Sequence, residues 1–111
     1  MDNRPIGVFD SGLGGLTVLK EIMEIMPGES IVYFGDSGRA PYGVKSKETV
    51  IKYTLQDIRF LLSHDIKMIV IACNTASACS LDTVRDRFNN MPVIEVIQPG
   101  ATMGVKQTKN K

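Results

Sequence analysis

The sequence has little of what several protein classes require. Its two cysteines are too few for the disulfide framework of a small secreted domain, so a reducing cytoplasm is the expected location. Lys and Arg number 13 against 12 Asp and Glu, a balance that indicates neither a nucleic-acid partner nor an anionic membrane. No apolar run approaches the roughly 18 residues of a membrane span. The 111 residues are therefore expected to form one domain with no nucleic-acid or membrane partner.

The sequence has one histidine, His64, and lacks the patterns that two further kinds of site require. Cys–His hydrolysis needs an imidazole beside the thiol, whereas His64 precedes an expected strand and Cys73 follows it. A strand of five or six residues separates such positions by about 16–20 Å. No cluster of His, Cys and carboxylate residues has the spacing of a metal site, so neither a metal nor another cofactor is expected.

What the sequence does have is a regular alternation of strand and helix patterns. The expected strands are Ile6–Phe9, Ile31–Phe34, Met68–Ala72 and Val93–Ile97. Helical spacing follows each of the first three strands. This order is typical of right-handed βαβ units, which build a parallel sheet between two layers of helices. We therefore expect an α/β fold of three layers (αβα) with a four-stranded parallel sheet.

Each expected helix carries an apolar face. In chain order, the three faces consist of Leu16, Leu19, Ile22, Met23 and Met26, then of Ile51, Leu55, Ile58 and Leu62, and then of Ala76, Ala78, Leu81, Val84 and Phe88. Ser46 is the expected N-cap of the second helix, and Asn74 or Thr75 is the expected N-cap of the third. The second helix is expected to end near His64, where the imidazole would interact with the last carbonyl groups.

Polar residues follow the strands at their carboxyl ends, which lie along one edge of a parallel sheet. They are Asp10, Ser11, Gly35, Asp36, Cys73, Asn74, Thr75 and Gln98. Open α/β sheets bind ligands at this edge. A thiol between a strand and a helix N-terminus lies among backbone N–H groups, which favours the thiolate form of Cys73. A buried structural cysteine is the alternative, but the polar Asn74 and Thr75 beside it favour a reactive one.

Two kinds of chemistry are considered for this edge of the sheet. Gly12, Gly14 and Gly15 are similar to a dinucleotide-binding turn, but Thr17 stands where its third glycine is required, and a tight strand-to-helix turn explains them as well. A thiolate without an imidazole can instead act as a general base. Nearby donors would hold a small carboxylate, and a dry pocket would make abstraction of an amino-acid α-proton less costly. Inversion also needs a second acid, and Cys79 lies inside the third helix, past its first turn.

Four segments resemble those of glutamate racemases in order and spacing. They are IGVFDSGLGGLTVLKEI, YFGDSGRAPYG, IVIACNTASA and PVIEVIQPGA. Aspartate racemases share the Cys-Asn-Thr sequence but fit the first two segments less well. The resemblance implies a cofactor-independent enzyme that interconverts L- and D-glutamate by two-base proton transfer and supplies D-glutamate for peptidoglycan.

The resemblance also assigns roles to residues. Cys73 is implied to be one of two proton-transferring thiols, and Asp10 to be a catalytic residue that orients a neighbour or meets the substrate ammonium group. The implied substrate contacts are Asp10, Ser11, Tyr42, Gly43, Asn74 and Thr75. Two of them have structural alternatives, since Tyr42 could anchor its loop and Gly43 could simply be a turn residue.

Glutamate racemases have a second α/β half, which carries the other catalytic cysteine in a Cys-Thr-His motif absent from this sequence. We expect residues 1–98 to be the N-terminal α/β half and residues 99–111 to begin the connection to the second half. The alternative is a non-enzymatic half-domain that binds a small dicarboxylate or only self-associates. Apolar surface that would face the second half favours homo-oligomers.

Overall fold

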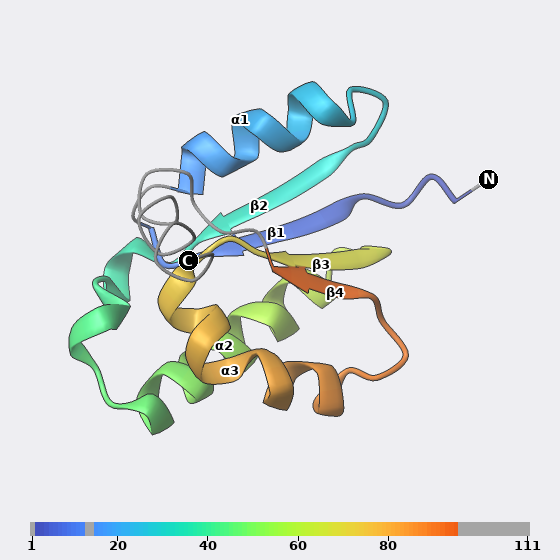
Figure 1. Ribbon diagram of the computed structural model, residues 1–111. Helices are drawn as coiled ribbons and strands as arrows, with labels where there is room; N and C mark the ends of the chain where they lie inside the picture. Colours follow the sequence, from blue (N-terminus) through green and yellow to red (C-terminus); the bar gives the residue numbers. More distant parts are fainter. Residues whose placement is uncertain (1, 13–14, 96–111) are drawn as a thin grey trace, which may run out of the picture.

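The computed structural model describes residues 2–12 and 15–95, apart from the side chains of residues 15–17 (Figure 1). Its elements are, in chain order, β1 (Ile6–Asp10), α1 (Gly15–Ile25), β2 (Ile31–Gly35), the 3-10 helices η1 (Ser37–Arg39) and η2 (Tyr42–Val44), α2 (Lys47–Leu62), β3 (Met68–Ile71), α3 (Asn74–Arg87) and β4 (Val93–Glu95). The alternation confirms the expected α/β class. None of these helices has the length and apolar character needed to cross a membrane.

The strands occur where the sequence predicts them, with small differences at their ends. β1 and β2 each extend one residue beyond the prediction, and β3 ends one residue before it. β4 covers Val93–Glu95. The predicted end of that strand at Ile97, the edge residue Gln98 and the connection expected over residues 99–111 all lie outside the described residues.

The four strands form one parallel sheet in the order β2-β1-β3-β4. β1 is therefore central, and it pairs with β2 from Ile6 opposite Ile31 and with β3 from Ile6 opposite Met68. The chain moves outward from β1 to β2 and then crosses back to the other side of β1 to form β3. In parallel sheets such a reversal leaves a crevice at the carboxyl ends of the two strands where the direction changes, here β1 and β3.

The helices cover both faces of the sheet, as the three-layer expectation requires. Figure 1 shows α1 on one face, with α2 and α3 on the other. Strand side chains alternate between the two cores. Val8 and Val70 pack with Val18 of α1, whereas Phe9 and Ile71 pack in the core under α2 and α3. Burial of both faces explains why the central strands read as continuous apolar runs.

Two residues assigned to apolar helix faces are misplaced, and the prediction for them was wrong. Met23 of α1 is 54% exposed, because Val18 and Ile22, one helical turn apart, are the residues that face the sheet. Ala78 of α3 is exposed as well. It follows the buried Ala76 by two positions, which places it about 200° further around the helix.

The caps of α2 and α3 differ in how well they were predicted. Ser46 caps α2 as expected, and its Oγ accepts a hydrogen bond from the Thr49 N–H at 3.2 Å. The expected cap of α3, Asn74 or Thr75, was wrong, since Cys73 itself is the N-cap and Asn74 is the first helical residue. A sulfur acceptor in the cap position leaves the two polar side chains in the first turn of the helix.

Candidate active site

A cavity of about 260 Å³ lies where the carboxyl ends of β1 and β3 meet the loop that precedes α2. Its lining consists of Ser11, Pro41, Tyr42, Gly43, Cys73, Asn74 and Thr75. Six of the seven residues singled out from the sequence therefore come together here. Asp10 is the seventh and does not line the cavity. Pro41 was not singled out, because a proline side chain offers no donor, acceptor or titratable group to recognise.

The topology of the sheet explains why distant segments meet at this place. Ser11 directly follows β1, and Cys73 follows β3 by two residues. The backbone holds them together, since the Ala72 N–H donates to the Phe9 carbonyl at 2.7 Å. The cavity thus lies in the crevice at the reversal of strand order, the usual ligand-binding position of open α/β sheets.

Cys73 combines burial with a hydrogen bond to its sulfur. The residue is 5% exposed, and its Sγ accepts from the Ala76 N–H at 3.4 Å. The bond is the N-cap interaction of α3, so the sulfur lies at the positive end of the helix dipole. A backbone donor and a helix N-terminus both stabilise a negative charge on sulfur.

Hydrogen-bonding groups surround the thiol. Ser11 is 5% exposed, and Asn74 and Thr75 are half-buried in the first turn of α3. The opposite wall is close, because a Cβ placed on Gly43 would lie 3.7 Å from Thr75 Oγ1. Hydroxyl and amide donors at a helix N-terminus are well suited to hold a carboxylate group of a small molecule.

Asp10 lies fully buried at the end of β1, and its carboxylate points toward groups outside the cavity lining. Oδ1 accepts from the Gly12 N–H at 2.8 Å, and Oδ2 accepts from the Tyr33 hydroxyl. Burial and this bond to Asp10 raise the pKa of Tyr33, so that the phenol keeps its hydrogen. The carboxylate therefore fixes the turn that carries Ser11.

Tyr42 is both a cavity residue and a loop anchor. Its side chain is 1% exposed, and its Oη lies 2.6 Å from Asp36 Oδ2 and 2.6 Å from Asp57 Oδ2. Burial, followed by the hydrogen bonds to these two carboxylates, raises the pKa of Tyr42. Because the hydroxyl is engaged in this way, the ring of Tyr42 is what it offers to the cavity.

Sequence reasoning missed two members of the group around Tyr42. Asp57 is 2% exposed within α2, and Arg39 donates to it through Nη2 at 3.0 Å. A signal for Asp57 was present, since it directly precedes Ile58 on the apolar face of an amphipathic helix. A buried carboxylate needs a partner, which indicates that a cationic side chain lies close to Asp57. The sequence carries no separate signal that this side chain is Arg39.

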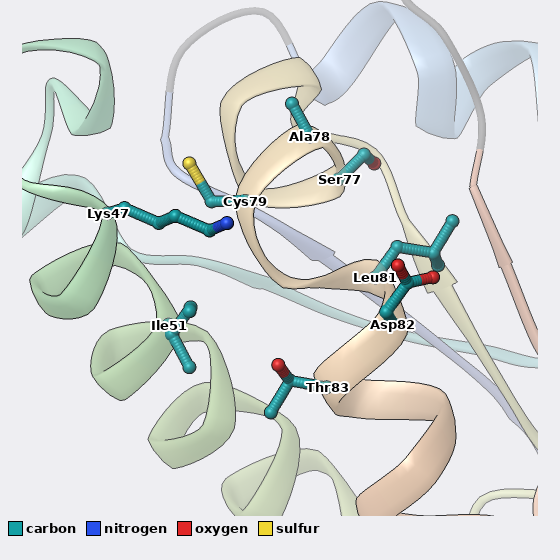
Figure 2. Close-up of a pocket in the computed structure, with 8 residues that line it drawn as sticks. All are labelled: Lys47, Ile51, Ser77, Ala78, Cys79, Leu81, Asp82 and Thr83. Atoms are coloured by element: carbon teal, nitrogen blue, oxygen red, sulfur yellow. The ribbon is translucent and has the colours of Figure 1, made fainter.

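Cys79 lies at a second cavity, of about 310 Å³, between α2 and α3 (Figure 2). The lining residues are Lys47, Ile51, Ser77, Ala78, Cys79, Leu81, Asp82 and Thr83. Figure 2 shows the Lys47 side chain of α2 extending toward the helix turn that carries Cys79. Both cysteines of the chain are free thiols. Cys79 is therefore not placed to act on a molecule bound beside Cys73.

His64 lies where the sequence placed it, just beyond the end of α2. Its Nδ1 is 3.2 Å from the Phe60 carbonyl oxygen, and its ring meets that of Phe60 edge-on at 5.1 Å. Since His64 precedes β3 and Cys73 follows it, the two residues lie at opposite ends of the strand. Across the part of the chain that the structure describes, no three His, Cys, Asp or Glu residues gather in a way that could hold a metal ion.

No protein-family model matches the sequence, but individual proteins do. The chain is 54% identical over 109 residues to the glutamate racemase of Lactococcus lactis subsp. lactis, and 51% identical over 107 residues to that of Neisseria gonorrhoeae. These matches cover 98% and 96% of the chain but only 40% of each relative. The chain thus spans about two fifths of the length of the curated relatives that it matches.

Solved structures agree with the sequence matches. The glutamate racemase of Francisella tularensis, crystallised with D-glutamate, superposes with a TM-score of 0.80 at 53% identity over 86% of this chain and 36% of that chain. The isoform RacE1 of Bacillus anthracis gives a TM-score of 0.83 at 44% identity over 96% of this chain and 40% of that chain. The four-stranded sheet with its flanking helices is therefore the fold of the matched part of these racemases.

Proposed function

Because the chain belongs to the glutamate racemase family, we propose that it forms one half of an active site that interconverts L- and D-glutamate. The observation that carries this proposal is the position of Cys73. Its buried sulfur accepts a backbone hydrogen bond at the N-terminus of α3 and lines a cavity with Ser11, Asn74 and Thr75. One of the similar structures, that of the Francisella tularensis glutamate racemase, was determined in complex with D-glutamate.

In the proposed reaction, the Cys73 thiolate takes the α-proton of glutamate and becomes a thiol. The electron pair of the broken C–H bond passes into the substrate carboxylate, which donors from Ser11, Asn74 and Thr75 stabilise. A second acid on the opposite face then gives a proton to the α-carbon and inverts it. Cys79 is not available for that step, so we propose that the second thiol belongs to a part of the protein outside this chain.

Asp10 is proposed as a positioning residue of this site. Both of its carboxylate oxygens accept hydrogen bonds, one from the Gly12 N–H and one from Tyr33. These bonds support the first of the two roles considered for Asp10, which is to orient a neighbour. Through the turn that it fixes, Asp10 determines where the Ser11 hydroxyl lies relative to the substrate.

The wider roles follow from the same proposal. Residues 1–98 are proposed to be the N-terminal α/β half, and residues 99–111 the start of a connection to the second half. The reaction requires no cofactor in this scheme, and its product would supply D-glutamate for peptidoglycan in the cytoplasm. A reducing compartment agrees with the two free thiols.

Proton exchange in D₂O tests the proposal directly on this chain. The chain is incubated with L-glutamate and, separately, with D-glutamate, while NMR follows loss of the α-proton and optical rotation follows inversion. Exchange in the parent chain that disappears in Cys73→Ser supports the thiolate as the base, because serine keeps the N-cap but not the acidity. No exchange with either enantiomer, in a chain that is folded, contradicts it.

A second candidate function is a half-domain that binds a small dicarboxylate without turning it over. The observation that favours it is the single thiol at the cavity, since only Cys73 lines it. Binding of glutamate without exchange would support this candidate, whereas exchange without inversion would support Cys73 as one working base of two. We also propose that the chain forms homo-oligomers.

A further inference from the structure

The loop between β2 and α2 brings Tyr42 and Gly43 to the cavity, although only two short 3-10 helices give it regular structure. Arg39 connects this loop to the residues packed around it through hydrogen bonds. Its Nε donates to Asp36 Oδ2 at 2.9 Å, and its Nη2 donates to Asp57 Oδ1 at 3.0 Å. One guanidinium group thus connects the end of β2, the loop itself and the middle of α2.

Two further residues of α2 fix the same guanidinium group. Arg39 Nη1 donates to Gln56 Oε1 at 2.6 Å, and the guanidinium carbon lies 3.9 Å from the centre of the Tyr53 ring. A guanidinium group is planar and presents its donors in a fixed fork, so contacts on several sides determine both its position and its orientation. Lysine could supply the charge at this place but not the geometry.

Tyr42 completes the network from the cavity side. Its single hydroxyl hydrogen cannot serve two carboxylates, yet Asp36 and Asp57 both lie at 2.6 Å. The arrangement is satisfied when Asp57 is protonated and donates its hydrogen to Asp36, while the Tyr42 hydroxyl donates to this pair of carboxyl groups. One positive charge on Arg39 then balances one negative charge on Asp36, which is what burial of such a group requires.

We propose that Arg39 and Asp57 are positioning residues of the site, holding the Tyr42 ring and the Gly43 backbone against Cys73 and Thr75. Neither residue lines the cavity, so they act through Tyr42 rather than by touching a ligand. The consequence for glutamate binding depends on the proposed function. The consequence for access to Cys73 does not, since it follows from the position of the loop alone.

Alkylation of Cys73 by iodoacetamide measures this access. In Arg39→Gln and Asp57→Ala the loop loses its anchor, and we expect the alkylation rate at Cys73 to rise about tenfold, as loss of one coupled interaction would allow. Peptide mass spectrometry separates Cys73 from Cys79, whose rate serves as the internal reference. Circular dichroism of each variant is the control for correct folding.

Conservative variants distinguish positioning from a general effect on stability. Asp57→Asn keeps a donor toward Asp36 and an acceptor for Arg39, so it should retain nearly the parental rate at Cys73. Arg39→Lys should give an intermediate rate. Arg59→Gln removes an exposed arginine from α2, the helix that carries Asp57, and should leave the alkylation rate at Cys73 unchanged. If Arg39→Gln does not fold, Arg39→Lys and Asp57→Ala decide the question, and parental rates in both would overturn the proposal.

Protection by D-glutamate separates this inference from the proposed function. In the parent chain, D-glutamate should slow alkylation of Cys73, and Arg39→Gln should need about tenfold more of it for half-protection. Equal half-protecting concentrations in the two proteins would overturn the positioning role. Absence of protection in the parent chain would contradict the proposed function, while the rates measured without glutamate would still support or overturn the anchoring of the loop.

Discussion

At the scale of single residues, Cys73 is at once the N-cap of α3 and part of the cavity wall. The same hydrogen bond, from the Ala76 N–H to Sγ, stabilises the start of the helix and any negative charge on the sulfur. A cap residue is held in place by its own helix, so the thiol needs no other side chain to orient it. The double role predicts that stability and reactivity can be separated by the choice of substitution.

Replacement of Cys73 tests that separation. We expect Cys73→Ala to lower the free energy of unfolding by about 1 kcal/mol through loss of the cap, and Cys73→Ser to preserve most of it. Both substitutions should abolish proton exchange from glutamate. Urea denaturation measures the stability of each variant, and a serine variant as unstable as the alanine variant would contradict the cap argument.

Gly12, in the turn after β1, has a backbone conformation and surroundings that leave no room for a side chain. Its φ is +98°, and a Cβ added there would lie 2.6 Å from Ser37 Cα. We expect Gly12→Ala to destabilise the chain by about 2 kcal/mol or more, because strain and a backbone clash combine. Gly38→Ala is the matched control, since nothing lies within 4 Å of its added Cβ, and it should change stability by no more than about 0.5 kcal/mol. Equal urea midpoints for the two variants would refute the argument.

At the scale of elements, the sequence predicted strands and helices well and helix faces less well. Continuous apolar runs located β1 and β3 because both faces of those strands are buried. Met23 was assigned wrongly because an apolar residue at the edge of a helical stripe is ambiguous until the sheet beneath it is known. The cap of α3 was missed because cysteine is rarely counted among capping residues.

The anchoring of the β2–α2 loop on α2 could not be predicted in the same way. The sequence placed Asp36 at the sheet edge and gave Tyr42 an alternative as a loop anchor, and the structure shows such an anchor. The partners of this anchor are two carboxylates that stand 21 residues apart in the chain (36 and 57). Local patterns carry no information on contacts across such a separation.

The shifted pKa values of Asp57 and Asp36 predict how the stability of the fold depends on pH. Burial and the neighbouring Asp36 raise the pKa of Asp57 from its ordinary 3.8 to about 7. Burial acts in the same direction on Asp36, but hydrogen bonds from Asp57 and Tyr42 outweigh it and lower the pKa of Asp36. Between pH 3.8 and about 7 the folded chain thus holds a proton on Asp57 that the unfolded chain releases, so this residue's contribution to stability declines as the pH rises through that window.

Asp57→Asn removes the titrating group while keeping its hydrogen bonds. We expect the parent chain to lose stability relative to this variant as the pH rises from 5 to 8, because only the parent must release a proton from a buried site. Urea denaturation at several pH values measures the difference. Asp86→Asn, at an exposed position of α3, is the control and should follow the parent. A constant difference between parent and Asp57→Asn across this range would show that Asp57 does not titrate there.

At the scale of the whole molecule, the order of strands determines where the site lies. The sequence predicted that polar residues would share one edge of the sheet, but it did not give the order β2-β1-β3-β4. That order makes β1 and β3 neighbours and so brings Ser11 beside Cys73–Thr75. Strand order is fixed by packing between distant segments, which is why alternation of elements alone could not supply it.

The cavity end of the molecule also carries an apolar side chain with nothing to cover it among the described residues. Val44, which follows Gly43 in η2, is 79% exposed. Ile25 is similarly exposed, at 75%, but it ends α1 and so lies toward the other end of the strands. If the chain associates with a second copy through its cavity end, Val44 should contribute to association and Ile25 should not.

Sedimentation velocity over a range of concentrations tests the proposed self-association. In a symmetric dimer each copy contributes the same surface, so loss of a buried valine counts twice. We expect Val44→Ser to weaken dimerisation at least about tenfold, since burial of one such side chain contributes roughly 1.5 kcal/mol. Ile25→Ser removes an equally exposed side chain and should leave the dimer intact. A parent chain that remains monomeric at high concentration, or an equal loss in both variants, would show that the cavity end is not the surface through which the chain associates.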